Sequence, residues 1–361
     1  MRTTRRGWAD EVTTITPVSA AEFRAQSEGR IPEAAQVADD VWCVPLEIAP
    51  GHMPFSLAYL VRDAAGDVHI IDPGYDVDAN FHAVVETLRD IAGERARLAS
   101  IVVTHLHPDH IGLAERLRAE TGASICLHAV EQWALEAVVA RASDPAGIRA
   151  GLAAWGVPED RHEELVHAAV RAPFTAVRAD VLVEDGAFLP IPGRRLRVRH
   201  TPGHTAGHIC VVDDDEGLIY TGDHVLPTVT PGVGLAGPDG ANPIDRYLSG
   251  LVDMRAFDDF VALPGHGYRF RGIAARAGQI ARRHLGRTSE VARALEEEPD
   301  ASVWEVASRL SWSRGWENLP PPHLTSALRQ TEMHVRLVGD GRHEEMRTVW
   351  GEDEPHPRPS E

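Results

Sequence analysis

Lysine is absent from this chain of 361 residues, so arginine supplies all 36 basic side chains. Any mechanism that needs a lysine amine, as a Schiff base or as a general base, is therefore excluded. The 54 acidic residues give a formal charge of −18, which repels nucleic-acid phosphates at long range. A small molecule is thus a better expected partner than a nucleic acid.

Cysteine and long apolar runs are also scarce. Cys43, Cys126 and Cys210 stand alone in apolar stretches, which favours buried thiols in a reducing compartment over disulfides. The arginine-rich residues 1–8 are not followed by an apolar signal region. No run approaches the 18 apolar residues needed to cross a bilayer. These absences predict a cytoplasmic protein that does not enter the membrane.

Histidine, in contrast, is concentrated in one short segment. Thr104-His105-Leu106-His107-Pro108-Asp109-His110 follows the apolar run 99–103 and places three imidazoles and one carboxylate within six positions. Such nitrogen and oxygen donors bind divalent zinc, iron or manganese. Without a metal they would be poorly solvated when packed together, and they would repel one another on protonation. The segment therefore predicts a metal site.

Further short motifs follow other apolar, strand-like runs. They contain Asp72 (Asp72-Pro73-Gly74), His204 and His208 (Thr201-Pro202-Gly203-His204-Thr205-Ala206-Gly207-His208), Asp223 and His224 (Thr221-Gly222-Asp223-His224), and His266 (Leu263-Pro264-Gly265-His266-Gly267). With the histidine segment, they occur in the order typical of the metallo-β-lactamase superfamily. The chain resembles that family over residues 72–266.

The resemblance implies an α/β fold, an αββα sandwich, with two divalent metal ions. Zinc is the first expectation, and manganese or iron also suits these ligands. By the matching motifs, His105, His107 and His204 hold one metal. Asp109, His110 and His266 hold the other, and Asp223 bridges both. A hydroxide shared by the two metals would act as the nucleophile, with Asp109 essential as a ligand.

Three residues near the expected ligands receive supporting roles. Asp72 is expected to hydrogen-bond a ligand histidine and fix its tautomer, and His208 could act likewise or simply pack in a strand. His224 directly follows Asp223, so a ring facing the pocket could protonate a leaving group. The alternative is that His224 turns toward the helical layer.

Changes in composition and apolar spacing along the chain predict four regions. They are an N-terminal extension (1–38), a catalytic domain (39–272), a small winged-helix-like domain (273–348) and a disordered tail (349–361). Residues 129–180 form a helical insert, with helices expected at 132–142, 145–155 and 160–172. We expect this insert to be a lid over the cleft, and the alternative is a homodimer surface.

The motifs also narrow the range of expected activities. No cysteine lies near Asp223, whereas true β-lactamases of this fold often place one at the comparable position. The pattern more closely resembles glyoxalase II-type thioesterases, lactonases and a ribonuclease branch. We therefore predict a dinuclear hydrolase of a small thioester, ester or lactone. A metal-dependent endoribonuclease is the alternative, favoured by the C-terminal region and opposed by the charge. An iron-dependent persulfide dioxygenase is a third, opposed by the complete second ligand set.

Overall fold

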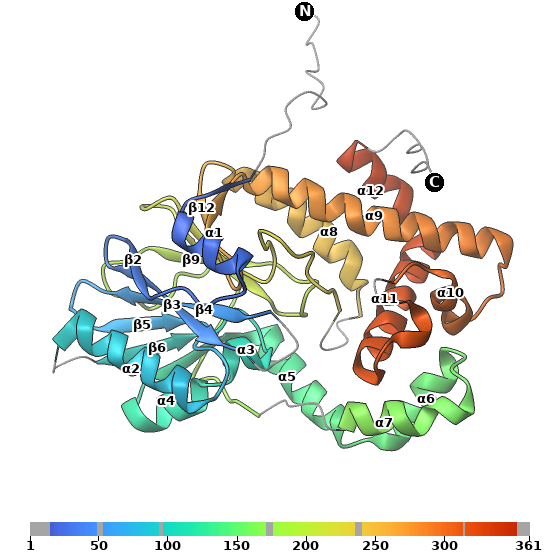
Figure 1. Cartoon of the computed structure of the whole chain (residues 1–361), viewed down its shortest axis with the longest axis horizontal. Coiled ribbons are helices and arrows are strands. Elements are labelled where there is room, and N and C mark those ends of the chain that lie inside the picture. The colour runs from blue at the N-terminus through green and yellow to red at the C-terminus, as the bar shows by residue number, and fades with distance from the viewer. Residues whose placement is uncertain are drawn as a thin grey trace, which may run out of the picture.

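Two stacked β-sheets with helices on both outer faces make up most of the molecule (Figure 1). The computed structural model describes residues 15–48, 53–93, 97–170, 176–234, 240–312 and 315–351. This arrangement confirms the αββα sandwich expected from the motifs.

The first sheet has seven strands. In spatial order they are β2 (Ala35–Ala38), β3 (Val41–Glu47), β4 (Phe55–Arg62), β5 (Val68–Ile71), β6 (Leu98–Val102), β7 (Ser124–His128) and β8 (Val181–Val183). Strands β2 to β5 pair antiparallel, and β5 to β8 pair parallel. Parallel strands buried on both faces are mainly apolar. The polar residues of β5 and β6, His69 and Ser100, are buried and hydrogen-bond to each other at 2.7 Å.

The second sheet has six strands. Their spatial order is β1 (Thr16–Pro17), β13 (Phe270–Arg271), β12 (Val261–Pro264), β11 (Leu218–Gly222), β10 (Ile209–Asp213) and β9 (Leu196–His200). Only β11 and β12 pair parallel. The two sheets share an apolar core in which the Tyr59 and Tyr220 rings meet edge to face, 5.3 Å apart.

Each outer face is covered by amphipathic helices. Helices α2 (Asp78–Ala92), α4 (Ala114–Thr121) and α5 (Ala129–Ala142) cover the seven-stranded sheet. Helices α8 (Pro243–Asp253), α9 (Ile273–Glu297) and α12 (Arg342–Trp350) cover the six-stranded sheet. The sheets thus hold the ends of their strands rigidly, and the motif loops follow these ends.

Residues 15–38 of the expected N-terminal extension pack on the sandwich and add a strand to each sheet. Strand β1 pairs with β13, and β2 pairs with β3. Between them, α1 (Ala20–Ser27) carries Glu22, whose carboxylate pairs with Arg269 at 2.8 Å. Both strands are short and lie at sheet edges; β1 depends on a partner distant in sequence, whereas β2 pairs with the strand that follows it.

The insert forms helices where the sequence predicts them. After α5 come α6 (Pro145–Ala154), the 3₁₀ turn Glu159–Arg161 and α7 (His162–Val170). These helices pack through an apolar cluster on α10 (Val303–Arg309) and α11 (Pro321–Gly339). In Figure 1, α6 and α7 lie below α10 and α11. The insert and the C-terminal helices therefore share one core.

A winged-helix-like region, as expected from the sequence, would have three helices, a turn and a terminal strand, and the expectation of that strand is wrong. The residues after the Gly339–Arg342 turn form helix α12 rather than a strand. Its buried residues His343, Met346 and Trp350 recur at helical spacing, and the last two join the core beside α9. Residues 352–361 of the predicted tail lie outside the described residues. Among the described helices, none has both the length and the apolar character to cross a membrane.

Candidate metal centre

Five motif loops meet at one edge of the sandwich. They follow β5, β6, β9, β11 and β12, so both sheets contribute. The histidine segment leaves β6 and enters the short helix α3 (Pro108–Ile111), with Pro108 at its first position. Because rigid strands end here, side chains from residues 72 to 266 converge although they are far apart in sequence.

The first group of ligand-type atoms is made only of histidines. The Nδ1 atom of His107 lies 3.0 Å from Nε2 of His105 and 3.0 Å from Nε2 of His204. These three residues form a group that could hold a metal ion. Ring nitrogens that point at one another with their lone pairs repel, and a cation at their centre removes that repulsion.

The second group combines Asp109, His110 and His266. The Nε2 atoms of the two histidines lie 3.1 Å apart, and Asp109 Oδ2 lies 3.3 Å from that of His266. Two nitrogens and one carboxylate oxygen are a normal donor set for a divalent ion.

Asp223 lies between the two groups. Its Oδ1 atom is 3.5 Å from Nε2 of both His110 and His266, and its Oδ2 atom is 3.7 Å from Nε2 of His204. Oδ1 is buried and has no hydrogen-bond donor in normal geometry among the described residues. A buried carboxylate oxygen without a donor is costly, and a bound cation would satisfy it. The donor set therefore fits two divalent ions.

Hydrogen bonds on the far side of four rings explain why their Nε2 lone pairs face the centre. Each Nδ1–H has an acceptor: Thr104 Oγ1 for His105, Asp72 Oδ2 for His110, the Gly232 carbonyl for His204 and the Phe55 carbonyl for His266. These contacts measure between 2.6 and 3.0 Å. They assign the tautomer that leaves Nε2 free to bind a metal.

Asp72 connects the hydrogen bonds of His105 and His110, because it accepts from Thr104 and from His110. Its carboxylate accepts from the Thr104 amide and hydroxyl, both at 2.7 Å, as well as from His110. Asp72 adopts φ 57°, a left-handed conformation that aspartate tolerates better than most residues. Asp72 also forms a third group of ligand-type atoms with His105 and His110, so its supporting role stays a prediction.

The histidines of the two groups differ in their pKa values. Burial and then the neighbouring His204 lower the pKa of His107 to about 3, and burial lowers the pKa of His105 well below its usual range. Burial also acts to lower the pKa of His110, but Asp223 and Asp72 outweigh it and the pKa is raised. At neutral pH, the first group is therefore a set of neutral imidazoles with available lone pairs.

His208 and His224 have different surroundings. Nε2 of His208 accepts a hydrogen bond from the Asp223 amide at 3.1 Å, so His208 supports the Asp223 backbone rather than a ligand ring. The His224 ring is fully buried against Tyr247 of α8, and burial lowers its pKa to about 3. This placement is the helical-layer alternative, and it contradicts a pocket-facing general acid.

Glu131 is a residue that the sequence reasoning missed. It lies in the first turn of α5 and is completely buried. Its carboxylate accepts from the Leu106 amide at 2.8 Å, the Thr205 hydroxyl at 2.6 Å and the Gly207 amide at 2.7 Å. Glu131 therefore ties the loop of His105 and His107 to the loop of His204.

The close packing of Glu131 explains why residue 207, in the loop of His204, is a glycine. A Cβ atom on Gly207 would lie 2.1 Å from the Glu131 backbone nitrogen, so no larger residue fits. In sequence, Glu131 is one of 54 acidic residues and stands outside every motif. Only the position of α5 against the two loops reveals it.

Comparison with known proteins identifies similar folds and families. The family model of the metallo-beta-lactamase superfamily matches residues 54–266. A metallo-beta-lactamase family protein from Thermus thermophilus is 25% identical, with a TM-score of 0.67, over 84% of this chain and 94% of its own. A beta-lactamase domain protein from Burkholderia ambifaria is 24% identical, with a TM-score of 0.70, over 92% of each chain, which shows the fold alone.

Relatives found by sequence match shorter parts of this chain. An uncharacterized protein of Mycobacterium tuberculosis is 26% identical over 216 residues, 58% of this chain and 84% of the relative. An atrochrysone carboxyl ACP thioesterase of Cryptosporiopsis sp. is 28% identical over 116 residues. That match covers 32% of this chain and 33% of the thioesterase.

Proposed function

The chain belongs to the metallo-beta-lactamase superfamily, whose members are metal-dependent hydrolases, and we propose that it hydrolyses a small acyl compound at a centre of two divalent metal ions. A thioester, an ester or a lactone is the proposed substrate class. Zinc is the proposed metal, with manganese or iron as alternatives.

The position of Asp223 is the observation that carries this proposal. One carboxylate oxygen faces His110 and His266, and the other faces His204. A carboxylate shared between two donor groups supports two ions rather than one. It favours hydrolysis over the chemistry of a single iron.

The expected ligands would be divided between two metal ions. His105, His107 and His204 would hold one ion, Asp109, His110 and His266 the other, and Asp223 both. Bound divalent ions supply Lewis acidity and lower the pKa of coordinated water, which makes a nucleophile available near neutral pH.

Other residues of the chain keep the ligands ready. Asp72, Thr104 and the backbone carbonyls of Phe55 and Gly232 hold the protons on the Nδ1 side of the rings, so that Nε2 stays free. Glu131 fixes the spacing of two ligand loops. The preorganised site thus needs little rearrangement to bind its ions.

A cysteine nucleophile is opposed by the positions of the thiols. All three cysteines are buried. Burial raises the pKa of Cys126 to about 11 and that of Cys210 to about 12, and it raises the pKa of Cys43 further. None of them is a thiolate near neutral pH, which supports water as the nucleophile.

The fungal relatives favour a thioester among the candidate substrates. One of them is named an atrochrysone carboxyl ACP thioesterase, although the match covers a third of its length. The chain carries 54 acidic residues and no lysine, which opposes an RNA substrate. We therefore place thioesters first in the experiment.

The test is a hydrolysis panel of acyl thioesters, aryl esters and lactones with the purified protein. Chelation should abolish turnover, and zinc should restore it. Asp223→Asn should lose at least about 100-fold in kcat/KM, because it removes a charged ligand from both ions. Asp90→Asn, on the exposed face of α2, is the matched control and should not change the rate. Turnover that survives chelation, or that Asp223→Asn leaves intact, would contradict the proposal.

A further inference from the structure

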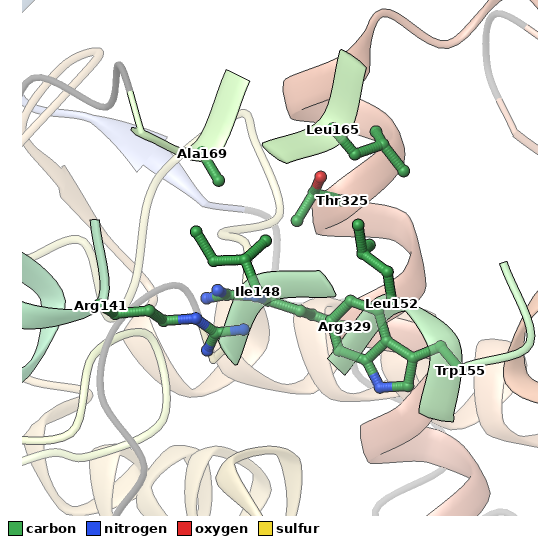
Figure 2. Close-up of a pocket in the computed structure, with 8 residues that line it drawn as sticks. All are labelled: Arg141, Ile148, Leu152, Trp155, Leu165, Ala169, Thr325 and Arg329. Carbon is green, nitrogen blue, oxygen red and sulfur yellow. The ribbon is translucent and has the colours of Figure 1, made fainter. Parts of the chain in front are cut away.

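A second site lies where the insert meets the C-terminal helices. A small pocket, partly open to solvent, lies between α5, α6, α7 and α11 (Figure 2). Its wall includes the apolar side chains of Ile148, Leu152 and Trp155. Arg141 enters from α5 and Arg329 from α11, and Figure 2 shows their guanidinium groups reaching toward each other.

Neither arginine forms a close ion pair among the described residues, and the acidic group that acts on Arg329 is Glu332, three positions along α11. Within the described ranges, neither forms a hydrogen bond, and no carboxylate oxygen lies within 4.0 Å of either. Many arginines of this acidic chain, such as Arg116 and Arg194, are paired with aspartates. Others, such as Arg276, donate to backbone carbonyls instead. Arg141 and Arg329 have neither kind of partner among the described residues.

The arrangement is costly as it stands. Arg329 is half-buried, and burial and the proximity of Arg141 lower the pKa of Arg329 to about 10. Arg141 is exposed, but its positive charge faces Arg329 beside an apolar wall, where the two like charges repel each other and Arg329 is incompletely hydrated. A structure that needed only packing here could use a neutral side chain. The cost suggests that an anion belongs between the two groups.

We propose that this pocket binds an oxoanion, a carboxylate or phosphate group, between the guanidinium groups of Arg141 and Arg329. Each planar guanidinium can donate two parallel hydrogen bonds to such a group. The limited space suits one small anionic group, with any attached hydrocarbon lying on Ile148, Leu152 and Trp155. The anion is either a free ion or the charged end of a larger ligand.

Helix α5 connects this pocket to the metal centre. Glu131 in its first turn bonds to the ligand loops, and Arg141 lies ten residues further along the same helix. At about 1.5 Å per residue, this separation corresponds to about 15 Å. If the oxoanion is part of the substrate, which rests on the proposed function, the acyl group lies at the metal centre near the start of α5 and the charge near the end of that helix.

The test of the site uses sulfate, because it is a weaker ligand for zinc than phosphate. Calorimetric titration at constant ionic strength would compare the holoenzyme with the Arg141→Gln/Arg329→Gln double variant. Arg336→Gln is the control, since Arg336 is exposed on the same helix as Arg329. We expect saturable binding to the wild type, at least tenfold weaker binding to the double variant and no change in the control. No saturable binding to the wild type, or equal binding to the double variant, would overturn the proposal.

A second arm identifies the source of the anion. The same acyl group is offered as a coenzyme A thioester, which carries distal phosphates, and as an N-acetylcysteamine thioester, which has none. If the anion belongs to the substrate, the double variant raises KM at least tenfold for the first thioester only. If KM changes for neither, the sulfate site serves a free oxoanion. Failure to hydrolyse either thioester counts against the proposed function, whereas the sulfate result stands by itself.

Discussion

Replacement of Glu131 by alanine tests the idea that one buried carboxylate holds two ligand loops together. The substitution leaves the Leu106 and Gly207 amides without an acceptor, while the Thr205 hydroxyl can rotate toward another. An unpaired buried amide costs about 1–3 kcal/mol, so the two amides together cost about 2–6 kcal/mol. Glu131→Gln keeps one acceptor and should cost about half as much.

We expect Glu131→Ala to reduce the metal affinity of the two sites by different amounts. Leu106 lies between His105 and His107, and Thr205 and Gly207 follow His204, so all three contacts support the histidine group. Loss of such supporting contacts weakens metal affinity by about 10–100-fold. The group of Asp109, His110 and His266 should lose less affinity, because Asp109 and His110 lie beyond Leu106 in helix α3 and His266 lies in a loop to which Glu131 forms no described hydrogen bond.

Zinc titration against a competing chelator would separate the two affinities, and urea unfolding of the metal-free protein would measure the stability. Glu136→Ala, on the exposed side of the same helix, is the control and should behave as the wild type. If Glu131→Ala binds both ions with wild-type affinity and unfolds at the same urea concentration, the reasoning is refuted. Equal weakening of both sites would show that Glu131 acts on the whole fold rather than on one loop pair.

Three further changes have defined outcomes. Asp72→Asn should lower the zinc affinity of the group containing His110 by about 10–100-fold in chelator competition, and unchanged affinity would contradict its role. His224→Gln should keep kcat within about threefold, whereas a general acid would be worth about 10²–10⁴ in rate. Burial and then His200 lower the pKa of His128 from 6.5 to about 4, so stability present above pH 6.5 is lost as the pH falls toward 4. His128→Asn, which keeps a helix cap, should remove about 2 kcal/mol of the difference in unfolding free energy between pH 7 and pH 5, and an unchanged difference would count against this.

The sandwich and the convergence of the ligands could be predicted because their signals are local. The expected ligand residues lie in short motifs that follow apolar runs, and the structure brings His105, Asp223 and His266 to one edge as predicted. The helices of the insert also showed clear apolar spacing. In each case, the prediction depended on residues that lie close together in the sequence.

The remaining features depend on contacts between distant parts of the chain. Glu131 acquires its role from loops 25 and 76 positions away. Strand β1 exists because β13, more than 250 residues later, offers a free edge. The burial of His224 depends on how α8 packs behind the Asp223 loop. Helix α12 did have a signal, the spacing of Met346 and Trp350, which a strand interpretation overlooked.

Metal content measures the central claim most directly. Elemental analysis of the protein, purified without added metal and dialysed, should find about two divalent ions per chain. The same analysis of Asp223→Asn should find a clear loss, because both donor groups share that carboxylate. One iron per chain, with oxygen uptake and no hydrolysis of any thioester, ester or lactone, would contradict the account.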